Sequence, residues 1–194
     1  AGGLTGGTDV ETNEQLFARL KEAVKQKPHG GALPDYVLWA KEVSGVTRVW
    51  PFSNWNGFGT VGLYFVRDDD ASLIPDAAEV QAVQDHVDSK RPAGMKGFTA
   101  YAPTEAAQDM TIQLAPNDST TQAAVTQELQ GLFLREAQVE DGEGSGTILI
   151  SHIREAISIA IGETDHNLVT PSADITHSAG ELATLGIITF QSMP

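Results

Sequence analysis

The chain has 194 residues, of which 41% are hydrophobic and 20% are charged, a composition typical of a folded protein with a substantial core. It contains no cysteine, so disulfides, thiolate metal ligands and cysteine nucleophiles are excluded. The formal net charge of −14 opposes binding to phosphate backbones and anionic membranes, and we therefore expect neither nucleic acid nor membrane as a partner.

The beginning of the chain predicts a leading helix. The residues from Ala1 to Gly7 have neither the basic nor the apolar region of a signal peptide and include no initiator Met, so we expect a processed or truncated chain. Thr12-Asn13-Glu14-Gln15 has the pattern of a capping box, and an apolar stripe follows it. These signals predict a helix over residues 12–26.

Five further elements are expected in the first half. Pro34 suits the first turn of a helix that Gly45 ends, and Pro92-Ala93-Gly94 ends another helix. A loop at 53–59, rich in Gly, Asn and aromatic residues, separates two strands. The expected order is helix, strand, strand, helix and strand, at residues 34–43, 46–51, 60–66, 76–91 and 98–101.

The second half predicts the order strand, helix, helix, strand and strand. Asn117-Asp118-Ser119 offers N-cap residues for a helix that continues to Phe133. Ser151 is the expected cap of a helix that runs to Ala160, after a polar loop at 140–146. The strands are expected at residues 110–115, 166–170 and 185–191.

Charge divides the chain near its middle. Residues 1–96 contain ten basic and thirteen acidic residues, whereas residues 97–194 contain two basic and thirteen acidic residues, so the halves carry −3 and −11. We predict an α+β protein with two small α/β-sandwich-like domains, each a short sheet with about two helices, after a leading helix. The expected parts are a leading segment with its helix at 1–30, a central domain at 31–104 and an acidic C-terminal domain at 105–194.

One pattern occurs in both halves: a short helix, a glycine, a strand, an irregular loop and a strand led by glycine. The glycines are Gly45 and Gly59 in the first half and Gly162 and Gly186 in the second. The pattern is compatible with two distantly related halves, although such units are common enough to need no shared ancestry.

Two patterns that suggest ligand binding have a simpler structural interpretation. The segment Gly57-Phe58-Gly59-Thr60-Val61-Gly62 has the glycine spacing of a dinucleotide fingerprint, but it leads into a strand and not a helix, so we interpret it as a hairpin loop. Asp68-Asp69-Asp70 lacks the spaced oxygen ligands of a calcium loop and is interpreted as a turn before a helix.

Catalytic and metal-binding motifs are also not found. Gly144-Ser145-Gly146 has the wrong spacing for a serine nucleophile, and it is interpreted as a loop. The histidines show no ligand spacing; they are His29, His86, His152, His166 and His177. We therefore predict no catalytic residue, no metal, no cofactor and no enzymatic activity.

A cluster of aromatic residues around the 53–59 loop is the candidate protein-contact site. The candidates are Trp50, Phe52, Asn54, Trp55 and Phe58. Strand alternation places Trp50 and Phe52 in the local core, whereas Trp55 and Phe58 lie in the turn, where large apolar side chains either fold back or form an interface. For Trp55 both interpretations remain open.

Several short motifs, taken in order, resemble the baseplate J-like family of contractile phage tails, whose members include proteins of Mu-like phages and prophages. In the first half the motifs are Gly6-Gly7-Thr8-Asp9-Val10-Glu11, Pro28-His29-Gly30-Gly31, Trp55-Asn56-Gly57-Phe58-Gly59-Thr60-Val61 and Arg91-Pro92-Ala93-Gly94. In the second half, Gly180-Glu181-Leu182-Ala183-Thr184-Leu185-Gly186 is similar to the closing strand motif of the family.

This resemblance covers the central and C-terminal domains of the family, whose full-length members are longer at the N-terminus. It implies a structural component of the baseplate wedge that assembles around the tail hub, without enzymatic activity or cofactor. The implied partners are other wedge and hub proteins, with self-association in the assembled baseplate. The implied location is the virion tail baseplate, assembled in the cytoplasm of the bacterial host.

Two other function classes remain as alternatives. One is a hydrolase-type enzyme built from scattered His and Asp residues, and the other is a host-surface or carbohydrate-binding tail module, because Trp50, Trp55 and Asn54 resemble stacking and hydrogen-bonding groups. An enzyme requires a concave pocket with converging polar groups, whereas an assembly protein requires broad flat or apolar patches.

Overall fold

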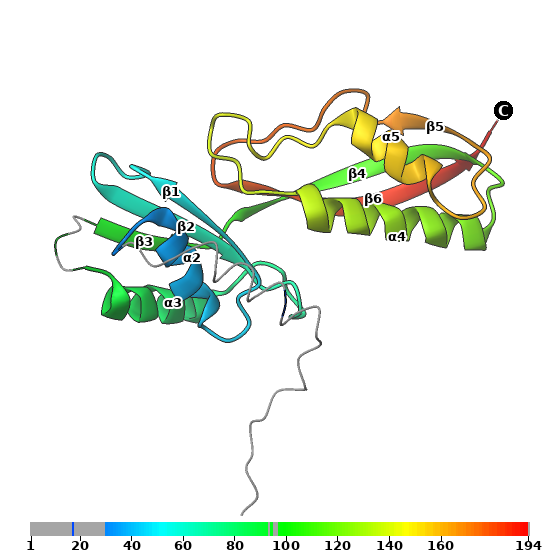
Figure 1. Ribbon diagram of the computed structural model, residues 1–194. Helices are drawn as coiled ribbons and strands as arrows, with labels where there is room; N and C mark the ends of the chain where they lie inside the picture. The colour runs from blue at the N-terminus through cyan, green and yellow to red at the C-terminus, as the bar shows by residue number, and fades with distance from the viewer. Residues whose placement is uncertain (1–16, 18–29, 93, 95–96, 194) are drawn as a thin grey trace, which may run out of the picture.

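The computed structural model describes residue 17, residues 30–92, residue 94 and residues 97–193. The elements from 33 to 101 form a first unit and those from 104 to 192 a second, and the two lie along an elongated molecule (Figure 1). The first unit contains α2 (Leu33–Lys41), β1 (Arg48–Ser53), β2 (Thr60–Val66), α3 (Ala77–Lys90) and β3 (Gly97–Tyr101). The second contains β4 (Thr104–Ala115), α4 (Ser119–Glu136), α5 (Ile150–Ser158), β5 (Asp165–Thr170) and β6 (Glu181–Ser192).

The α+β fold class is confirmed, since each unit has one three-stranded sheet and two helices among the described residues. The expected order of elements is also found in both halves. The leading helix at 12–26 lies outside the described residues, apart from the exposed, helical Phe17. The division into domains at residue 104 stays a prediction.

The first sheet has the strand order β1-β2-β3, with β2 antiparallel to β1 and parallel to β3. Val61, Leu63 and Phe65 of β2 point toward α2 and α3 and form a buried cluster with side chains from both helices. The alternate β2 residues, Gly62, Tyr64 and Val66, therefore point to the other face of the sheet.

The second sheet has the order β5-β4-β6, with β4 antiparallel to β5 and parallel to β6. Met110, Ile112 and Leu114 of β4 are buried in one cluster with side chains of α4 and α5. These two helices therefore cover the face of the sheet that carries these three residues.

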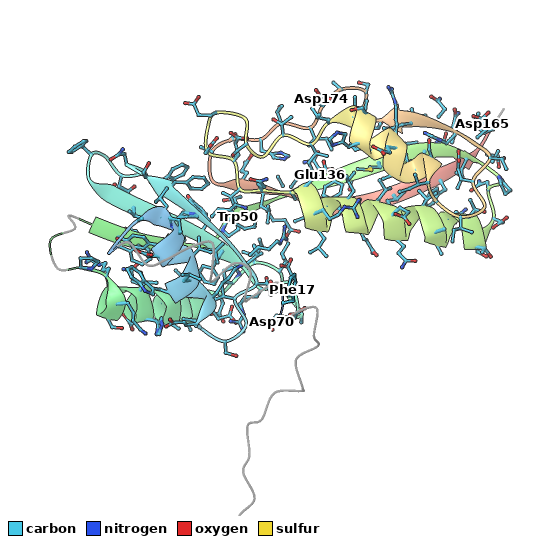
Figure 2. All side chains as sticks on the ribbon, in the orientation of Figure 1. Phe17, Trp50, Asp70, Glu136, Asp165 and Asp174 are labelled. Carbon is cyan, nitrogen blue, oxygen red and sulfur yellow. The ribbon has the colours of Figure 1, made fainter. Side chains whose placement is uncertain are left out.

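Helix caps explain where most helices begin. Asp76 caps α3: its Oδ1 accepts from the backbone N of Ala78 and Glu79 at 2.8 and 2.9 Å. Asp118 caps α4, as expected from its sequence. The helix expected after the polar loop is found as α5, but its expected cap was wrong, because Ser151 lies inside the helix and Asp174 Oδ1 instead accepts from Ile150 N at 2.8 Å (Figure 2).

The strands of the second unit are longer than expected. β4 begins at Thr104 and not at residue 110, because its first half is polar and mostly exposed and gives no apolar signal. β6 begins at Glu181 and contains Gly186 in its interior, where Gly186 and Ile187 form a bulge opposite the single residue Asp109 of β4. A Cβ at Gly186 would lie 2.4 Å from Asp109 Oδ1, so the glycine allows the close approach of Asp109 at the bulge and does not lead the strand.

The two units share a continuous core. Tyr64 and Val66 of the first sheet belong to the same buried cluster as the core of the second unit. Arg48 Nη1 donates to the carbonyl oxygen of Ala137, the residue after α4, at 3.0 Å. Gly180 has a φ of +84°, and a Cβ there would lie 2.9 Å from the Tyr64 hydroxyl, so both its conformation and this contact favour glycine.

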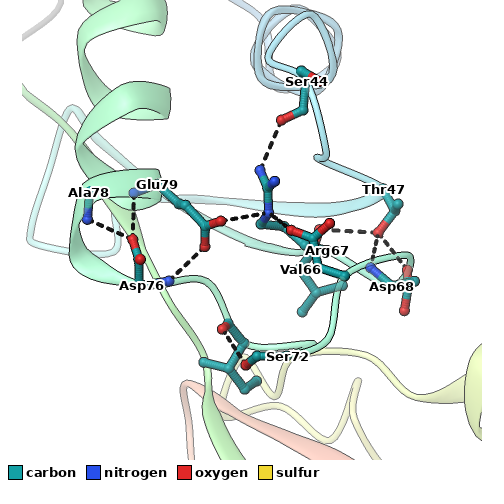
Figure 3. A network of polar contacts seen from close by, with 11 residues as sticks. Ser44, Thr47, Val66, Arg67, Asp68, Ser72, Asp76, Ala78 and Glu79 are labelled. Carbon is teal, nitrogen blue, oxygen red and sulfur yellow. Dashed lines mark hydrogen bonds and ion pairs between the residues drawn. The ribbon is translucent and has the colours of Figure 1, made fainter. Parts of the chain in front are cut away.

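The acidic turn after β2 is held by ion pairs (Figure 3). Asp68 is paired with Arg48, with Nη2 and Oδ1 2.7 Å apart, and Asp70 is paired with Arg67. Arg67 also contacts Glu79 Oε1 at 3.0 Å. These contacts give Asp68 and Asp70 a role in the turn, in agreement with the interpretation of the Asp run as structural.

The polar loop at 140–146 is organised by a buried carboxylate. Glu140 is 3% exposed, and its two oxygens accept from the backbone N of Gly142, Gly144 and Gly146 at 2.7 to 2.9 Å. The hydrogen bonds from the loop backbone to the buried Glu140 carboxylate therefore stabilise the conformation of the loop.

Candidate protein-contact site

The face of the first sheet opposite α2 and α3 carries a layer of aromatic side chains. The strand register places Trp50 beside Tyr64, Phe52 beside Gly62, and Tyr64 beside Tyr101. Because these pairs share the parity of Tyr64, they lie on the face that neither helix of this unit covers. We call this set, with Trp55 from the hairpin, the aromatic face; its members are Trp50, Phe52, Trp55, Tyr64 and Tyr101.

The rings of the aromatic face pack against one another. Phe52 and Trp55 stack with centroids 4.9 Å apart, and Tyr64 and Tyr101 stack at 5.0 Å. The Trp55 and Tyr64 rings meet edge to face at 5.5 Å. Tyr64 is 8% exposed, and this burial raises the pKa of its hydroxyl above its usual value. The other four rings are partly buried against the cluster that contains Tyr64, Val66 and the core of the second unit.

Trp55 folds back over the sheet. A Cβ at Gly62 would lie 2.6 Å from Trp55, so the missing side chain at Gly62 is what allows the indole to lie there. Trp55 is thus held by Gly62 on one side and by ring contacts with Phe52 and Tyr64. This placement favours the packing interpretation of Trp55 over an indole that projects into solvent.

The hairpin turn itself is held by hydrogen bonds. Asn54 has a φ of +60°, a conformation that Asn tolerates better than most residues, and its Oδ1 accepts from Gly59 N at 2.9 Å. The backbone N of Asn56 donates to Thr60 Oγ1 at 3.0 Å, and Asn56 Nδ2 donates to the Tyr101 hydroxyl at 2.6 Å. The Asn54 side chain therefore stabilises the turn through its hydrogen bond with Gly59 N.

Phe58 is the candidate residue that the turn leaves in solvent. Its side chain is 88% exposed, the highest value among the large hydrophobic residues of the described chain. The exposure leaves the ring accessible to a partner protein, although single exposed apolar side chains such as Ile161, which is 85% exposed, also occur elsewhere on the surface. Of the five predicted contact residues, the structure thus brings Trp50, Phe52 and Trp55 together and places Phe58 outside them.

Tyr64, Tyr101 and Asn56 were missed by the sequence analysis. The face on which Tyr64 lies could have been predicted, because strand alternation puts Tyr64 on the same side of β2 as Gly62 and opposite to Leu63 and Phe65. Tyr101 reaches the aromatic face only through the parallel pairing of β2 with β3, across the whole of α3.

No alternative site with a clear chemistry is found in the part of the chain that the structure describes. There, no group of three or more His, Asp or Glu side chains is placed to hold a metal ion. Within the same residues, no helix has the length and apolar character needed to cross a bilayer. Three of the histidines are engaged by Glu carboxylates: His86 by Glu42, His152 by Glu136 and His166 by Glu163.

In a comparison with known protein families, each of the two units matches a domain of the same family. Residues 28–102 match the Baseplate J-like central domain, and residues 108–191 match the Baseplate J-like protein C-terminal domain. The first match ends at residue 102, just after β3, and the second begins at residue 108, inside β4.

Individual relatives lead to the same family. The chain is 37% identical to the putative protein JayE of Escherichia coli K12, over 96% of this chain and 69% of the relative. It is 34% identical to the Mu-like prophage FluMu protein gp47 of Haemophilus influenzae, over 95% of this chain, and 32% identical to baseplate protein gp47 of Escherichia phage Mu, over 96%. The chain spans about half, 53%, of the length of each gp47 protein. The chain belongs to the Baseplate J-like family.

Proposed function

We propose that this chain is a structural component of a phage or prophage tail baseplate and that it contacts a neighbouring baseplate protein through the hairpin tip. The baseplate role is supported by the family membership and by the name of the Mu relative, a baseplate protein. The observation that carries the contact is the 88% exposure of Phe58 on a hydrogen-bonded turn. Phe is one of the aromatic residues that are enriched at protein–protein interfaces relative to the rest of the surface.

The finer parts of the proposal follow from the resemblance to the family. The chain acts in the wedge, meets other wedge and hub proteins, and self-associates in the assembled baseplate. It has no enzymatic activity, and it assembles in the cytoplasm of the bacterial host. The aromatic face supports assembly over carbohydrate binding, because its rings stack on one another, whereas a sugar platform presents an open ring face.

The division into a central and a C-terminal domain near residue 104 is part of this proposal. It is supported by the short connection between β3, which ends at Tyr101, and β4, which begins at Thr104. The shared core around Tyr64 and Val66 indicates that the two domains act as one body in the assembled particle.

The contact is tested with Phe58→Ala in a contractile-tailed phage whose own copy of the gene is deleted. We expect the variant to melt like the wild type, since Phe58 makes few contacts, but to be lost from purified tails. Ile161→Ala is the matched control, because Ile161 is 85% exposed in the second unit and lies outside the proposed contact.

Trp55→Ala separates packing from contact in the same assay. We expect it to lower the free energy of unfolding by about 2–4 kcal/mol, because it removes a ring packed against Gly62, Phe52 and Tyr64. Tails that contain normal amounts of the Phe58→Ala protein would contradict the proposed contact. Tails that form without this chain at all would contradict the baseplate role.

A further inference from the structure

A cleft at the junction of the two units is lined by basic and apolar side chains. It has a volume of about 320 Å³ and lies between the end of α2, the start of β1 and the last turn of α4. Figure 2 shows Trp50 and Glu136 on the two sides of this junction. The lining residues used below are Lys41, Arg48, Trp50, Leu134 and Arg135.

Positive charge is concentrated in this cleft. Lys41, Arg48 and Arg135 line it, and no Asp or Glu is among its lining residues. The protein as a whole carries −14, and Arg135 is one of only two basic residues after residue 96. Because Asp68 pairs with Arg48, the charge without a paired carboxylate among the described residues comes from Lys41 and Arg135, and these two cations mark a local site for negative charge.

The three cations are not equivalent. Arg48 is held in place by Asp68 and by the carbonyl oxygen of Ala137, and its guanidinium lies 5.3 Å from the centre of the Trp50 ring. Lys41 and Arg135 are exposed, and no carboxylate of the described residues forms an ion pair with either. Lys41 and Arg135 therefore supply the charge that a ligand can neutralise.

The Arg135 guanidinium lies close to Gly131, one helical turn earlier on α4. A Cβ at Gly131 would lie 3.0 Å from Arg135 Nη1, so the guanidinium lies over Gly131 along α4. On its other side, Arg135 also lines a cleft between α4 and α5 that contains Glu136 and Glu155. Glu136 is engaged by His152, with Oε2 and Nδ1 2.7 Å apart.

The cleft also has an apolar wall. Leu134 is 55% exposed beside the cations, and Trp50 is partly buried on the opposite side. An inorganic anion would make no use of these two side chains, whereas a peptide with carboxylates on either side of an apolar residue would use all of the cleft.

We propose that this cleft binds a short acidic segment of a neighbouring protein, with an apolar side chain between Leu134 and Trp50 and carboxylates on Lys41 and Arg135. This inference rests on the proposed assembly role and adds the chemistry of a second partner contact, separate from the hairpin tip. Binding there engages side chains of both units at once.

The test uses the whole chain, labelled with ¹⁵N, and a fluorescein-labelled peptide of repeated Glu-Glu-Leu triplets. We expect the peptide to shift the backbone amide signals of the cleft, around Lys41, Trp50 and Arg135. The double variant Lys41→Gln with Arg135→Gln should bind about tenfold more weakly, because two charge-assisted contacts are lost. Arg154→Gln, which removes the other basic residue of the second half, should bind like the wild type.

Three results would overturn the proposal: amide shifts outside the cleft, equal binding of a Gln-Gln-Leu peptide, or full competition by inorganic phosphate at a matching charge concentration. The last result would indicate a simple anion site. Amide spectra of the variants show directly whether they are folded. Because the peptide is measured on the isolated chain, its failure leaves the Phe58 tail assay unaffected, so the two proposals fail separately.

Discussion

The two sheets use the same pairing scheme but present different open faces. In each, a central strand has an antiparallel neighbour on one side and a parallel neighbour on the other, and two helices cover one face. The open face of the first sheet is aromatic, whereas that of the second carries mainly hydroxyl and amide groups, with Gln113 on the central strand hydrogen-bonded to Asn167 at 2.8 Å. A polar face is stable in contact with water, whereas the aromatic face is partly buried against the core that the two units share.

The chain order behind this common scheme differs. In the first sheet the central strand is the second of the three, and in the second sheet it is the first. The repeated unit expected from Gly45, Gly59, Gly162 and Gly186 therefore does not reproduce one hairpin twice, because β5 and β6 flank β4 and do not pair with each other. The similarity of the two sheets lies in the pairing scheme.

The largest expected effect distinguishes the two open faces through substitutions on the two central strands, β2 and β4. Tyr64→Ala should lower the free energy of unfolding by about 3–5 kcal/mol, because the ring is buried and contacts three other aromatic rings and Gly180. Gln113→Ala, on the open face of the second sheet, should change it by about 0.5 kcal/mol or less. Urea denaturation measures both values.

Tyr64→Phe is the control for the ring itself and should keep most of the stability. Equal losses for Tyr64→Ala and Gln113→Ala would remove the distinction between the two open faces.

A smaller effect is expected at the junction and depends on pH. Burial raises the pKa of Asp68, but hydrogen bonds from Arg48 and Thr47 and the charge of Arg48 outweigh it, so the pKa lies below the usual value. Because the pKa of Asp68 is lower in the folded protein than in the unfolded chain, its carboxylate contributes stability at pH values above the unfolded-state pKa of about 4. This contribution is lost as the pH falls through the folded-state pKa. Arg48→Gln should therefore cost about 1–2 kcal/mol at neutral pH and clearly less at pH ~3.

The measurement is urea denaturation of both proteins at the two pH values. Other carboxylates titrate in the same range, so the informative quantity is the difference between wild type and variant. A difference that stays constant with pH would show that Arg48 acts through Ala137 alone and not through Asp68.

Much of the first unit could be predicted from local signals. β2 matches its expected range of 60–66, and α3 lies within one residue of the expected 76–91, because alternation and caps are encoded in neighbouring residues. The aromatic face could be predicted only in part, since the position of Trp55 depends on Gly62 across a strand pair and that of Tyr101 on a crossover. The cap of α5 comes from Asp174, far along the chain, and no local pattern contains it.

The smallest expected effect concerns the helix pairs, which both units join by a His and a Glu. Glu42 and His86 link α2 to α3, and Glu136 and His152 link α4 to α5. The hydrogen bond and charge of Glu136 raise the pKa of His152 above its usual value. Glu136→Gln should lower that pKa toward the ordinary value with little change in stability, because the pair is exposed.

An NMR titration of the His152 ring measures this directly. Because the pKa of His152 is raised in the folded protein, the stabilisation by its pairing with Glu136 is fully present at pH values below the ordinary His pKa. It is lost as the pH rises through the folded-state pKa of His152. Glu155→Gln removes a more weakly coupled carboxylate and should move the pKa less. A larger change in the pKa of His152 for Glu155→Gln than for Glu136→Gln would identify Glu155, and not Glu136, as the main partner of His152.

The pairing of β4 with β6 has a consequence for how the chain is made. The first sheet is complete once Tyr101 has been synthesised, but β4 (104–115) must wait for β5 and then for β6 (181–192), the last strand of the second sheet. During translation, α4 and α5 are available to cover the apolar face of β4 before β6 exists, but the edge of β4 that pairs with β6 stays unpaired until residues 181–192 leave the ribosome. A nascent chain halted before residue 181 would therefore present one finished sheet and one central strand with an open edge, which is a template for pairing with other chains.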